Sequence, residues 1–164
     1  MKPQKIASFR IDHTKLDRGV YLSRIDESPS IYSLYVNTYD IRVCKPYVDE
    51  PMPRDAMHSI EHLGATFLRK HRKYAGNIIY FGPMGCATGF YLVIFPDGMT
   101  DQDVVNLVKE MFEYVAKFPE MHQRLPGSTK KECGNYKMHW VRKASRIAKD
   151  FLAGYNWKMG KYPR

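Results

Sequence analysis

Long apolar runs are the first thing that this sequence lacks. None of its 164 residues belongs to a stretch near the roughly 20 apolar residues that a membrane-spanning helix needs. The opening segment, MKPQKIASFRIDH, has no apolar block before its first charges, so we expect no secretory signal. The sequence therefore predicts a cytoplasmic protein without a membrane partner, and its length suits one domain over residues 1–164.

Cysteine is scarce, with only three residues in the chain: Cys44, Cys86 and Cys133. An odd and sparse set in a chain without a secretory signal argues against a disulfide framework. It points instead to thiol chemistry or to metal ligation. We interpret Cys44 as a small buried apolar residue.

Acidic residues are outnumbered, 17 against 26 lysines and arginines, which leaves a net charge of +9. This charge permits nucleic-acid binding. However, the basic residues are spread along the chain, and the densest cluster, over residues 69–73, falls at the end of an expected helix, where it complements the helix dipole. Motifs that read bases are absent, so we expect no nucleic-acid partner.

Strand-forming residues concentrate in the first 95 residues, and the chain has neither an internal repeat nor a Gly/Ser linker. A β-branched and aromatic run predicts a long strand over residues 31–43. Shorter strands are expected at 77–81 and 89–95, with a weaker candidate at 20–25. Between the candidates 77–81 and 89–95, the sequence GPMG predicts a turn or loop.

Helical periodicity predicts three helices, over residues 55–71, 100–118 and 135–153. Asp55 can cap the first helix, Thr100 and Asp103 resemble a capping box for the second, and Gly154 suits the position after the third. Strands placed early, with helices interspersed and late, predict an α+β fold. We expect a single-domain sandwich in which an antiparallel sheet carries its helices on one face.

The first predicted helix carries the stretch HSIEH. His58 and His62 are four residues apart and so share one side of the helix, where neutral imidazoles suit zinc or ferrous iron. Glu61 falls between the histidines and the apolar stripe, where a proton-transfer role is plausible. A solvent-facing histidine pair with a helix-stabilising glutamate is the alternative, and the motif also matches inverted-zincin peptidases.

Two cysteines are candidates to complete such a site. Cys133, with Gly134 beside it, falls near the predicted start of the third helix, where the helix N-terminus would favour a thiolate. A buried thiol is the other interpretation, and spacing alone does not decide between them. Cys86 lies between Gly85 and Gly89, so we expect its thiol to face a pocket and to act as nucleophile or acid/base, with a structural role still open.

Five motifs in a fixed order resemble S-ribosylhomocysteine lyase, the family that makes a quorum-sensing autoinducer precursor in bacteria. The motifs extend over most of the chain, and five in order are far more specific than any one of them. They are SFRIDHTK from Ser8, YDIR from Tyr39, HSIEH from His58, PMGCATGF from Pro83, and ECG from Glu132 with the later Met138-His139.

The resemblance implies a role for each matching residue, and Asp12 and Asp40 belong to the same motifs with less defined roles. It also implies one divalent metal per chain, Fe²⁺ in the native state with Zn²⁺ or Co²⁺ as substitutes. The implied groups are the metal ligands His58, His62 and Cys133, the acid/base pair Glu61 and Cys86, and the substrate-binding residues Ser8, His13 and Arg42.

The implied reaction cleaves S-ribosylhomocysteine into homocysteine and dihydroxypentanedione without net redox change. The implied assembly is a homodimer with sites at the subunit interface, built from both chains. Two positions depart from the family pattern: Tyr80 stands where an acidic residue is common, and Ala87 where a polar or basic one is common. Tyr80 affects one expected substrate contact.

Two other functions are compatible with the HSIEH helix. An inverted-zincin peptidase would use His58 and His62 with Glu61 as base, and would not require the PMGC motif. A non-enzymatic, metal-stabilised binding module would close the metal site with a fourth protein ligand.

Overall fold

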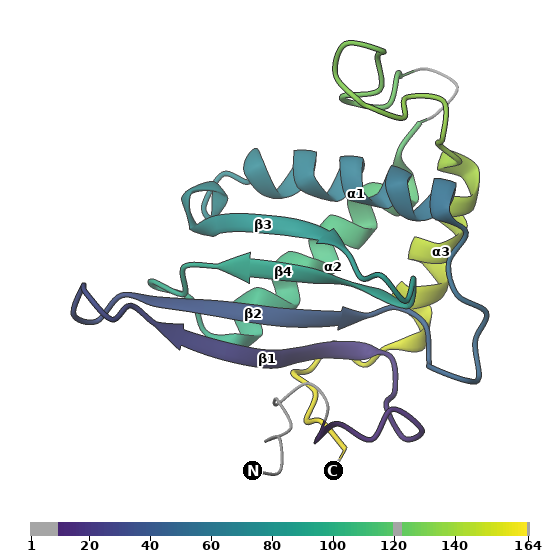
Figure 1. The fold of residues 1–164 in the computed structure, drawn as a ribbon. Coiled ribbons are helices and arrows are strands. Elements are labelled where there is room, and N and C mark those ends of the chain that lie inside the picture. Colours follow the sequence, from purple (N-terminus) through teal and green to yellow (C-terminus); the bar gives the residue numbers. More distant parts are fainter. Residues whose placement is uncertain (1–9, 120–122, 164) are drawn as a thin grey trace, which may run out of the picture.

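A four-stranded antiparallel sheet forms one layer of the protein. The computed structural model describes residues 10–119 and 123–163. The sheet order is β1-β2-β4-β3, with every neighbouring pair antiparallel (Figure 1). The strands are β1 (Gly19–Glu27), β2 (Tyr35–Arg42), β3 (Ile78–Pro83) and β4 (Gly89–Ile94).

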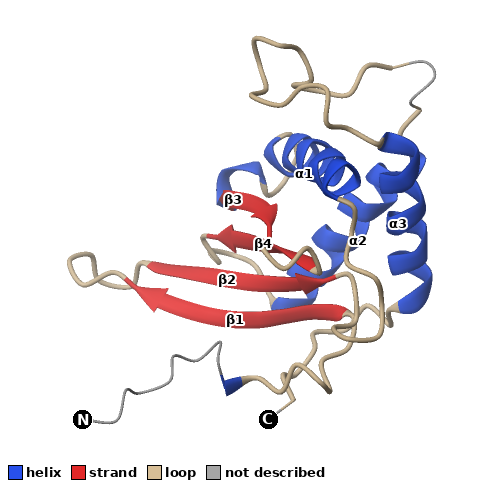
Figure 2. Ribbon diagram, turned by 45° about the vertical axis from the view of Figure 1, so that its right-hand side comes forward, coloured by secondary structure: helices blue, strands red, loops and turns tan. Residues whose placement is uncertain are grey.

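Three helices form the second layer, on one face of the sheet (Figures 1 and 2). They are α1 (Arg54–Arg69), α2 (Asp101–Lys117) and α3 (Val141–Gly154), and a short 3₁₀ turn, Ala75–Asn77, precedes β3. The predicted α+β class with an antiparallel sheet is confirmed. None of the described helices is long and apolar enough to cross a membrane.

The long strand expected over residues 31–43 is shorter than predicted. A turn fills the start of that range: the N–H of Leu34 donates to the carbonyl of Ile31, and Ser33 has φ of 60°. Ile31 and Tyr32 are exposed at the tip of the β1–β2 hairpin, so their β-branched and aromatic character misled the prediction. The weaker candidate at 20–25 proves to be the core of β1.

Helix boundaries follow capping chemistry only in part. The Thr100–Asp103 capping box is present at the start of α2, as predicted. Asp55 is not the cap of α1, because that helix starts one residue earlier and Asp55 lies in its first turn. Gly154 is the last residue of α3 and not the residue after it, so that prediction was wrong.

The third helix begins at Val141, six residues later than predicted. The chain before it is held against α1 instead: the N–H of Trp140 donates to the Asp55 carbonyl at 3.2 Å and to the Ser59 hydroxyl at 2.9 Å. These bonds hold the end of the 123–140 loop against α1, and the loop lies above that helix in Figure 1.

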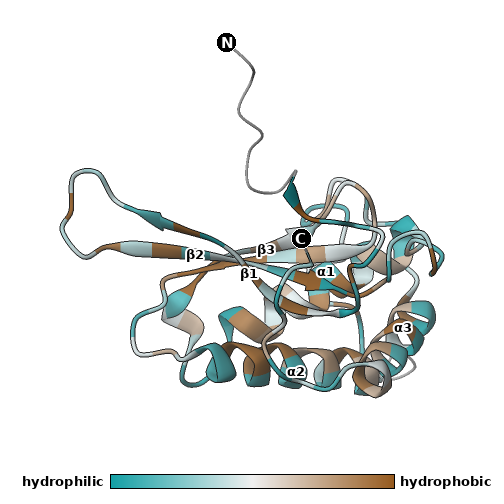
Figure 3. Cartoon of the chain, turned by 90° about the horizontal axis from the view of Figure 1, so that it is seen from below, coloured by the Kyte–Doolittle hydropathy of each residue, from teal (hydrophilic) through white to brown (hydrophobic). Residues whose placement is uncertain are grey.

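The core lies between the sheet and the helices, where apolar faces meet (Figure 3). Strand β4 contributes Phe90, Leu92 and Ile94, all fully buried. Gly64 lets α1 approach β3 closely, because a Cβ atom there would stand 2.5 Å from the Phe81 ring. This contact fixes the inner side of α1, so its other side is left for His58 and His62.

Candidate metal centre and thiol site

The two histidines of α1 lie on successive turns, and Cys133 approaches them from the loop before α3. The Nε2 atoms of His58 and His62 are 3.1 Å apart, and the Cys133 Sγ is 3.4 Å from the His58 Nε2. All three side chains are half-buried. Residues 75 positions apart in the chain therefore meet at one point.

Backbone carbonyls fix how both imidazoles are protonated. The Nδ1 of His58 lies 2.8 Å from the Met138 carbonyl oxygen, and the Nδ1 of His62 lies 2.9 Å from that of Pro126. Because a carbonyl can only accept, each Nδ1 must carry the proton, and each neutral ring keeps its lone pair on Nε2. When both rings are in this neutral form, two lone pairs face each other at 3.1 Å, which is repulsive unless a proton or a metal cation lies between them.

The spacing of these atoms fits a tetrahedral divalent metal. Metal bonds of about 2.1 Å to nitrogen and about 2.3 Å to sulfur place two nitrogens about 3.4 Å apart, and a nitrogen and a sulfur about 3.6 Å apart. The observed separations of 3.1 and 3.4 Å are within a few tenths of an ångström of these values. The donor set is therefore suited to zinc, cobalt or ferrous iron.

His139 joins the same cluster, a position that the sequence analysis placed in a motif without assigning it a role. The potential ligand atoms of all four residues lie within 4.8 Å of one another. Its ring stacks on His58, with centroids 4.1 Å apart and planes 20° apart. A ring nitrogen directs its lone pair in the ring plane, so two near-parallel stacked rings cannot both aim at one ion. His139 therefore forms a wall of the cluster.

The His139 ring is held neutral in this position. Burial, and then the electrostatic repulsion that His58 and His62 would exert on a second positive charge whenever they are protonated, lower the pKa of His139 to about 4. Within residues 10–119 and 123–163, neither ring nitrogen has a hydrogen-bond partner, although both are shielded from solvent. The sequence analysis did not place His139 in the cluster because it lies far from HSIEH along the chain.

Cys133 does not lie at a helix N-terminus, contrary to prediction. Helix α3 begins at Val141, so its dipole is eight residues away from the thiol. A turn takes over the role: the Cys133 N–H donates to the Thr129 carbonyl, and the Asn135 N–H donates to the Cys133 sulfur at 3.4 Å. The local backbone therefore presents a hydrogen-bond donor to this sulfur.

A second group of polar side chains surrounds Cys86, on the loop between β3 and β4. Cys86 is exposed, and its Sγ lies 3.1 Å from the Thr88 Oγ1 and 3.7 Å from an Arg42 guanidinium nitrogen. Burial raises the pKa of the Cys86 thiol, but the hydrogen bonds from Thr88 and the charge of Arg42 outweigh it. The net result is a lowered pKa, which favours the reactive thiolate.

Arg42 is held by a buried ion pair. Its guanidinium donates to the Asp40 Oδ2 at 2.6 Å, and the two residues are 4% and 2% exposed. Tyr162, in the C-terminal segment after α3, donates to the same oxygen at 3.1 Å and stacks on Tyr21. Asp40 and Arg42 lie two residues apart on the sheet face that the helices leave open, because Ile41 between them faces the core.

The other predicted site residues are less tightly placed. His13 lies close enough to Asp40 for its charge to favour the Asp40 carboxylate, while burial is the main influence and raises that pKa. Glu61 is half-buried on α1, and its carboxylate forms no hydrogen bond or ion pair with any described residue. Asp12 pairs with Lys15 near the surface, and Ser8 lies outside the described residues.

The two groups remain separate within one chain. Among the described residues, no hydrogen bond or ion pair joins Cys86 or Arg42 to His58, His62 or Cys133. The expected juxtaposition of Cys86 and Glu61 across a metal is thus not formed by direct contacts inside one chain.

Cys44 is buried, as its interpretation as a small apolar residue requires. Burial raises the pKa of its thiol to about 11, so it stays protonated at neutral pH. Of Cys44 and Cys86, Cys86 is therefore the more reactive thiol.

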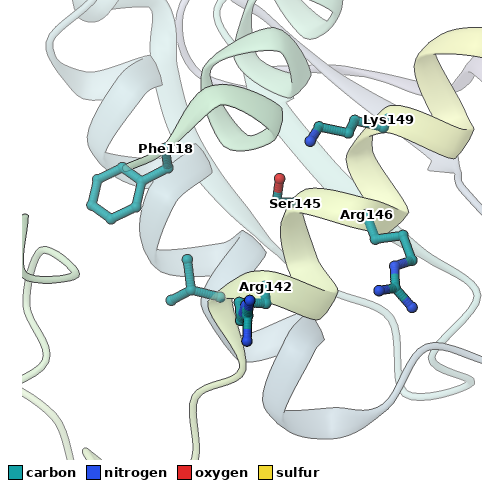
Figure 4. A pocket seen from close by; sticks show the side chains of 6 residues that line it. Phe118, Arg142, Ser145, Arg146 and Lys149 are labelled. Carbon is teal, nitrogen blue, oxygen red and sulfur yellow. The ribbon is translucent and has the colours of Figure 1, made fainter. Parts of the chain in front are cut away.

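A basic hollow lies elsewhere, between α3 and the residue that follows α2 (Figure 4). It has a volume of about 310 Å³ and is lined by Phe118, Val141, Arg142, Ser145, Arg146 and Lys149. The Ser145 hydroxyl donates to the Ala116 carbonyl and so is already engaged. The hollow contains none of the predicted site residues, and it holds part of the chain's excess positive charge.

Known proteins resemble this chain over nearly its whole length. A family model described as S-ribosylhomocysteinase (LuxS) matches residues 6–161. The chain belongs to this family. Among curated proteins, an S-ribosylhomocysteine lyase of Desulfotalea psychrophila is 48% identical over 134 residues, which is 82% of this chain and 80% of the relative.

Other relatives carry the same name. An S-ribosylhomocysteine lyase of Borreliella burgdorferi is 46% identical over 149 residues, covering 91% of this chain and 90% of the relative. One of Clostridium acetobutylicum is 45% identical over 133 residues, covering 81% and 80%. The range that the family model matches, residues 6–161, includes the positions of both groups of site residues.

The geometry predicts different effects for substitutions of the two proposed ligands His58 and Cys133 and of the neighbouring His139. We expect His58→Ala and Cys133→Ala to lose bound metal, whereas His139→Phe keeps about one metal per chain because a ring still fills the wall. Metal content is measured by mass spectrometry on cobalt- or zinc-loaded, desalted protein. His71→Ala, a histidine of the same region paired with Glu110, is the matched control. Loss of metal in His139→Phe would show a fourth ligand and a closed site.

Proposed function

We propose that this protein is a carbon–sulfur lyase that cleaves S-ribosylhomocysteine into homocysteine and dihydroxypentanedione, the autoinducer precursor. The names of the relatives support this activity. The observation that carries the proposal is the pairing, in one small chain, of a metal-ligand cluster with a separate, thiolate-stabilising group around Cys86. A peptidase has no use for the second group.

A metal at the cluster suits the first part of this reaction. His58, His62 and Cys133 would hold it, in the native state as Fe²⁺, with Zn²⁺ or Co²⁺ able to replace it. When bound, such an ion acts as a Lewis acid on the substrate carbonyl. Three protein ligands leave a coordination position open for substrate, which a structural site does not.

The chain's own residues would move the protons. Shifting the sugar carbonyl along its carbon chain requires a proton to leave the carbon beside the carbonyl and a proton to be added to the former carbonyl carbon, which turns the neighbouring hydroxyl carbon into the new carbonyl. The Cys86 thiolate, formed readily because its pKa is lowered, would take and return these protons, with the Glu61 carboxylate as its partner. Once the carbonyl lies two carbons from the carbon that bears sulfur, loss of one more proton expels the homocysteine thiol.

The substrate-binding role of Arg42 and His13 follows from the same arrangement. Both lie around Asp40, beside the thiol group, where a cation and an imidazole can bind the polar ends of the substrate. Ser8 belongs to the same proposed set by its motif. We propose one domain over residues 1–164, working in a reducing compartment such as the cytoplasm, which the three free cysteines suit.

A homodimer with interfacial sites would unite the two groups. Within one chain no hydrogen bond or ion pair between described residues joins Cys86 to the metal-ligand cluster, and aromatic side chains are exposed on the open face of the sheet beside it. Tyr80 is 48% exposed and Tyr91 37% exposed on adjacent strands. Apolar side chains that remain uncovered on a sheet face commonly mark an interface. Docking a second copy there would bring Cys86 of one chain near the cluster of the other.

The activity is tested by thiol release. We expect iron- or cobalt-loaded protein to release homocysteine from S-ribosylhomocysteine, with loss of at least about a hundredfold in Cys86→Ala and Glu61→Gln, because each removes a proton carrier. Cys44→Ala, which removes only the buried thiol, is the matched control and should retain activity. Release of homocysteine by Cys86→Ala at the wild-type rate would refute the proposal. Intact activity toward peptides in that variant would favour the inverted-zincin alternative.

A shared site is tested by mixing two inactive proteins. Cys86→Ala and Cys133→Ala each lack one group, but a mixed dimer contains one complete site if each site uses both chains. After subunit exchange at equal concentrations, we expect about a quarter of wild-type homocysteine release. Mixtures that remain as inactive as the separate variants, with dimer exchange verified by mass spectrometry, would place each site within one chain.

A further inference from the structure

Thr88 lies between the guanidinium of Arg42 and the sulfur of Cys86. Its Oγ1 is 2.5 Å from an Arg42 nitrogen and 3.1 Å from the Cys86 Sγ. Its side chain is buried, at 8% exposure, although Cys86 itself is exposed. The hydroxyl is therefore shielded from water and is confined to these two partners.

Chemistry fixes the direction of both hydrogen bonds. A guanidinium has only donors, so the Thr88 oxygen must accept from Arg42. The single hydroxyl proton is then free for the sulfur, and a thiolate is an acceptor only. The backbone N–H of Thr88 also bonds to Cys86, so one residue provides two donors to the same sulfur.

The backbone between these residues is shaped for this contact. Ala87 has φ of 58°, in the left-handed region that residues other than glycine seldom adopt. This conformation turns the chain back so that Thr88 faces Cys86. It is held by bonds from the Ala87 N–H to the Met84 carbonyl and from the Met52 N–H to the Ala87 carbonyl.

We propose that Thr88 is a functional residue of this site, whose hydroxyl, oriented by Arg42, donates to Cys86 and holds it as the thiolate. The proposal rests on the proposed function in one respect, that Cys86 is the proton carrier. Behind Thr88, Asp40 and Tyr162 keep Arg42 in place. The residue thus connects a buried ion pair to an exposed sulfur.

The titratable and charged groups that face Cys86 come from two strands. They are Arg42 on β2, Asp40 behind it on the same strand, and Tyr91 on β4. The pKa of Tyr91 is raised mainly by burial, and the charges of Asp40 and Cys86 raise it further. Arg42 stays charged at every accessible pH, so its influence on Cys86 is constant. Removing the Thr88 hydroxyl removes a donor to the charged form only, and the pKa of Cys86 must then rise.

The test follows the alkylation of Cys86 by iodoacetamide against pH, in metal-loaded protein without substrate, with the Cys86 peptide quantified by mass spectrometry. For Thr88→Val we expect the midpoint to move to higher pH, leaving about tenfold less thiolate at neutral pH, since a hydrogen bond to a charged group is lost. Thr88→Ser keeps the hydroxyl and should titrate like wild type. Thr38→Val, on the same sheet, is the matched control.

Lyase kinetics provide a second readout. The acid limb of the kcat/KM profile should move to higher pH in Thr88→Val and return in Thr88→Ser. Thr88→Ala serves if the valine variant does not fold. An unchanged Cys86 midpoint in a folded Thr88→Val or Thr88→Ala variant, or an equal shift in Thr88→Ser, would overturn the proposal. If wild-type protein releases no homocysteine, the lyase proposal fails, but the alkylation series still decides the role of Thr88.

Discussion

Two facing imidazole lone pairs are the constraint on which this site depends. The Nε2 atoms of His58 and His62 stand 3.1 Å apart, and carbonyl groups behind them prevent either ring from relieving the contact by changing tautomer. Those carbonyls belong to the loop before α3, which also brings Cys133 to the same point. A cation at the cluster would therefore stabilise the folding of this loop over α1, because its ligands come from both segments.

The thiol group is built on a different principle. There the charge is permanent, in a buried Asp40–Arg42 pair on the open face of the sheet, and it acts on Cys86 directly and through Thr88. Cys86 itself stays exposed on a strained loop, where substrate can reach it. The metal-ligand cluster on α1 thus suits the binding of a metal, and the group around Cys86 on the open face of the sheet suits proton transfer.

Several features of the fold and of the metal-ligand cluster could be predicted from the sequence because local chemistry determines them. The capping box at Thr100, the antiparallel strands and the shared face of His58 and His62 all follow from short-range periodicity. The late start of α3 does not, since bonds from Trp140 to α1 override the helical pattern.

Contacts between residues far apart in the chain could not be predicted from the sequence, because short-range patterns carry no information about which distant segments pack together. The stacking of His139 on His58 and the reach of Tyr162 to Asp40, 122 residues away, arise only when distant segments pack together. Motif resemblance indicated candidate residues for both groups and implied sites built from two chains; the structure adds that, in the part of the chain that it describes, no hydrogen bond or ion pair joins Cys86 to the cluster within one chain.

The central claim is a metal centre with two imidazoles, one thiolate and one position free for substrate. X-ray absorption at the metal edge of zinc-loaded protein tests it most directly, because the method counts sulfur and imidazole neighbours. The account predicts one sulfur at about 2.3 Å, two imidazole nitrogens at about 2.0–2.1 Å and one further light atom. Three imidazoles in the shell, with His139 as the third, or the absence of sulfur would contradict it.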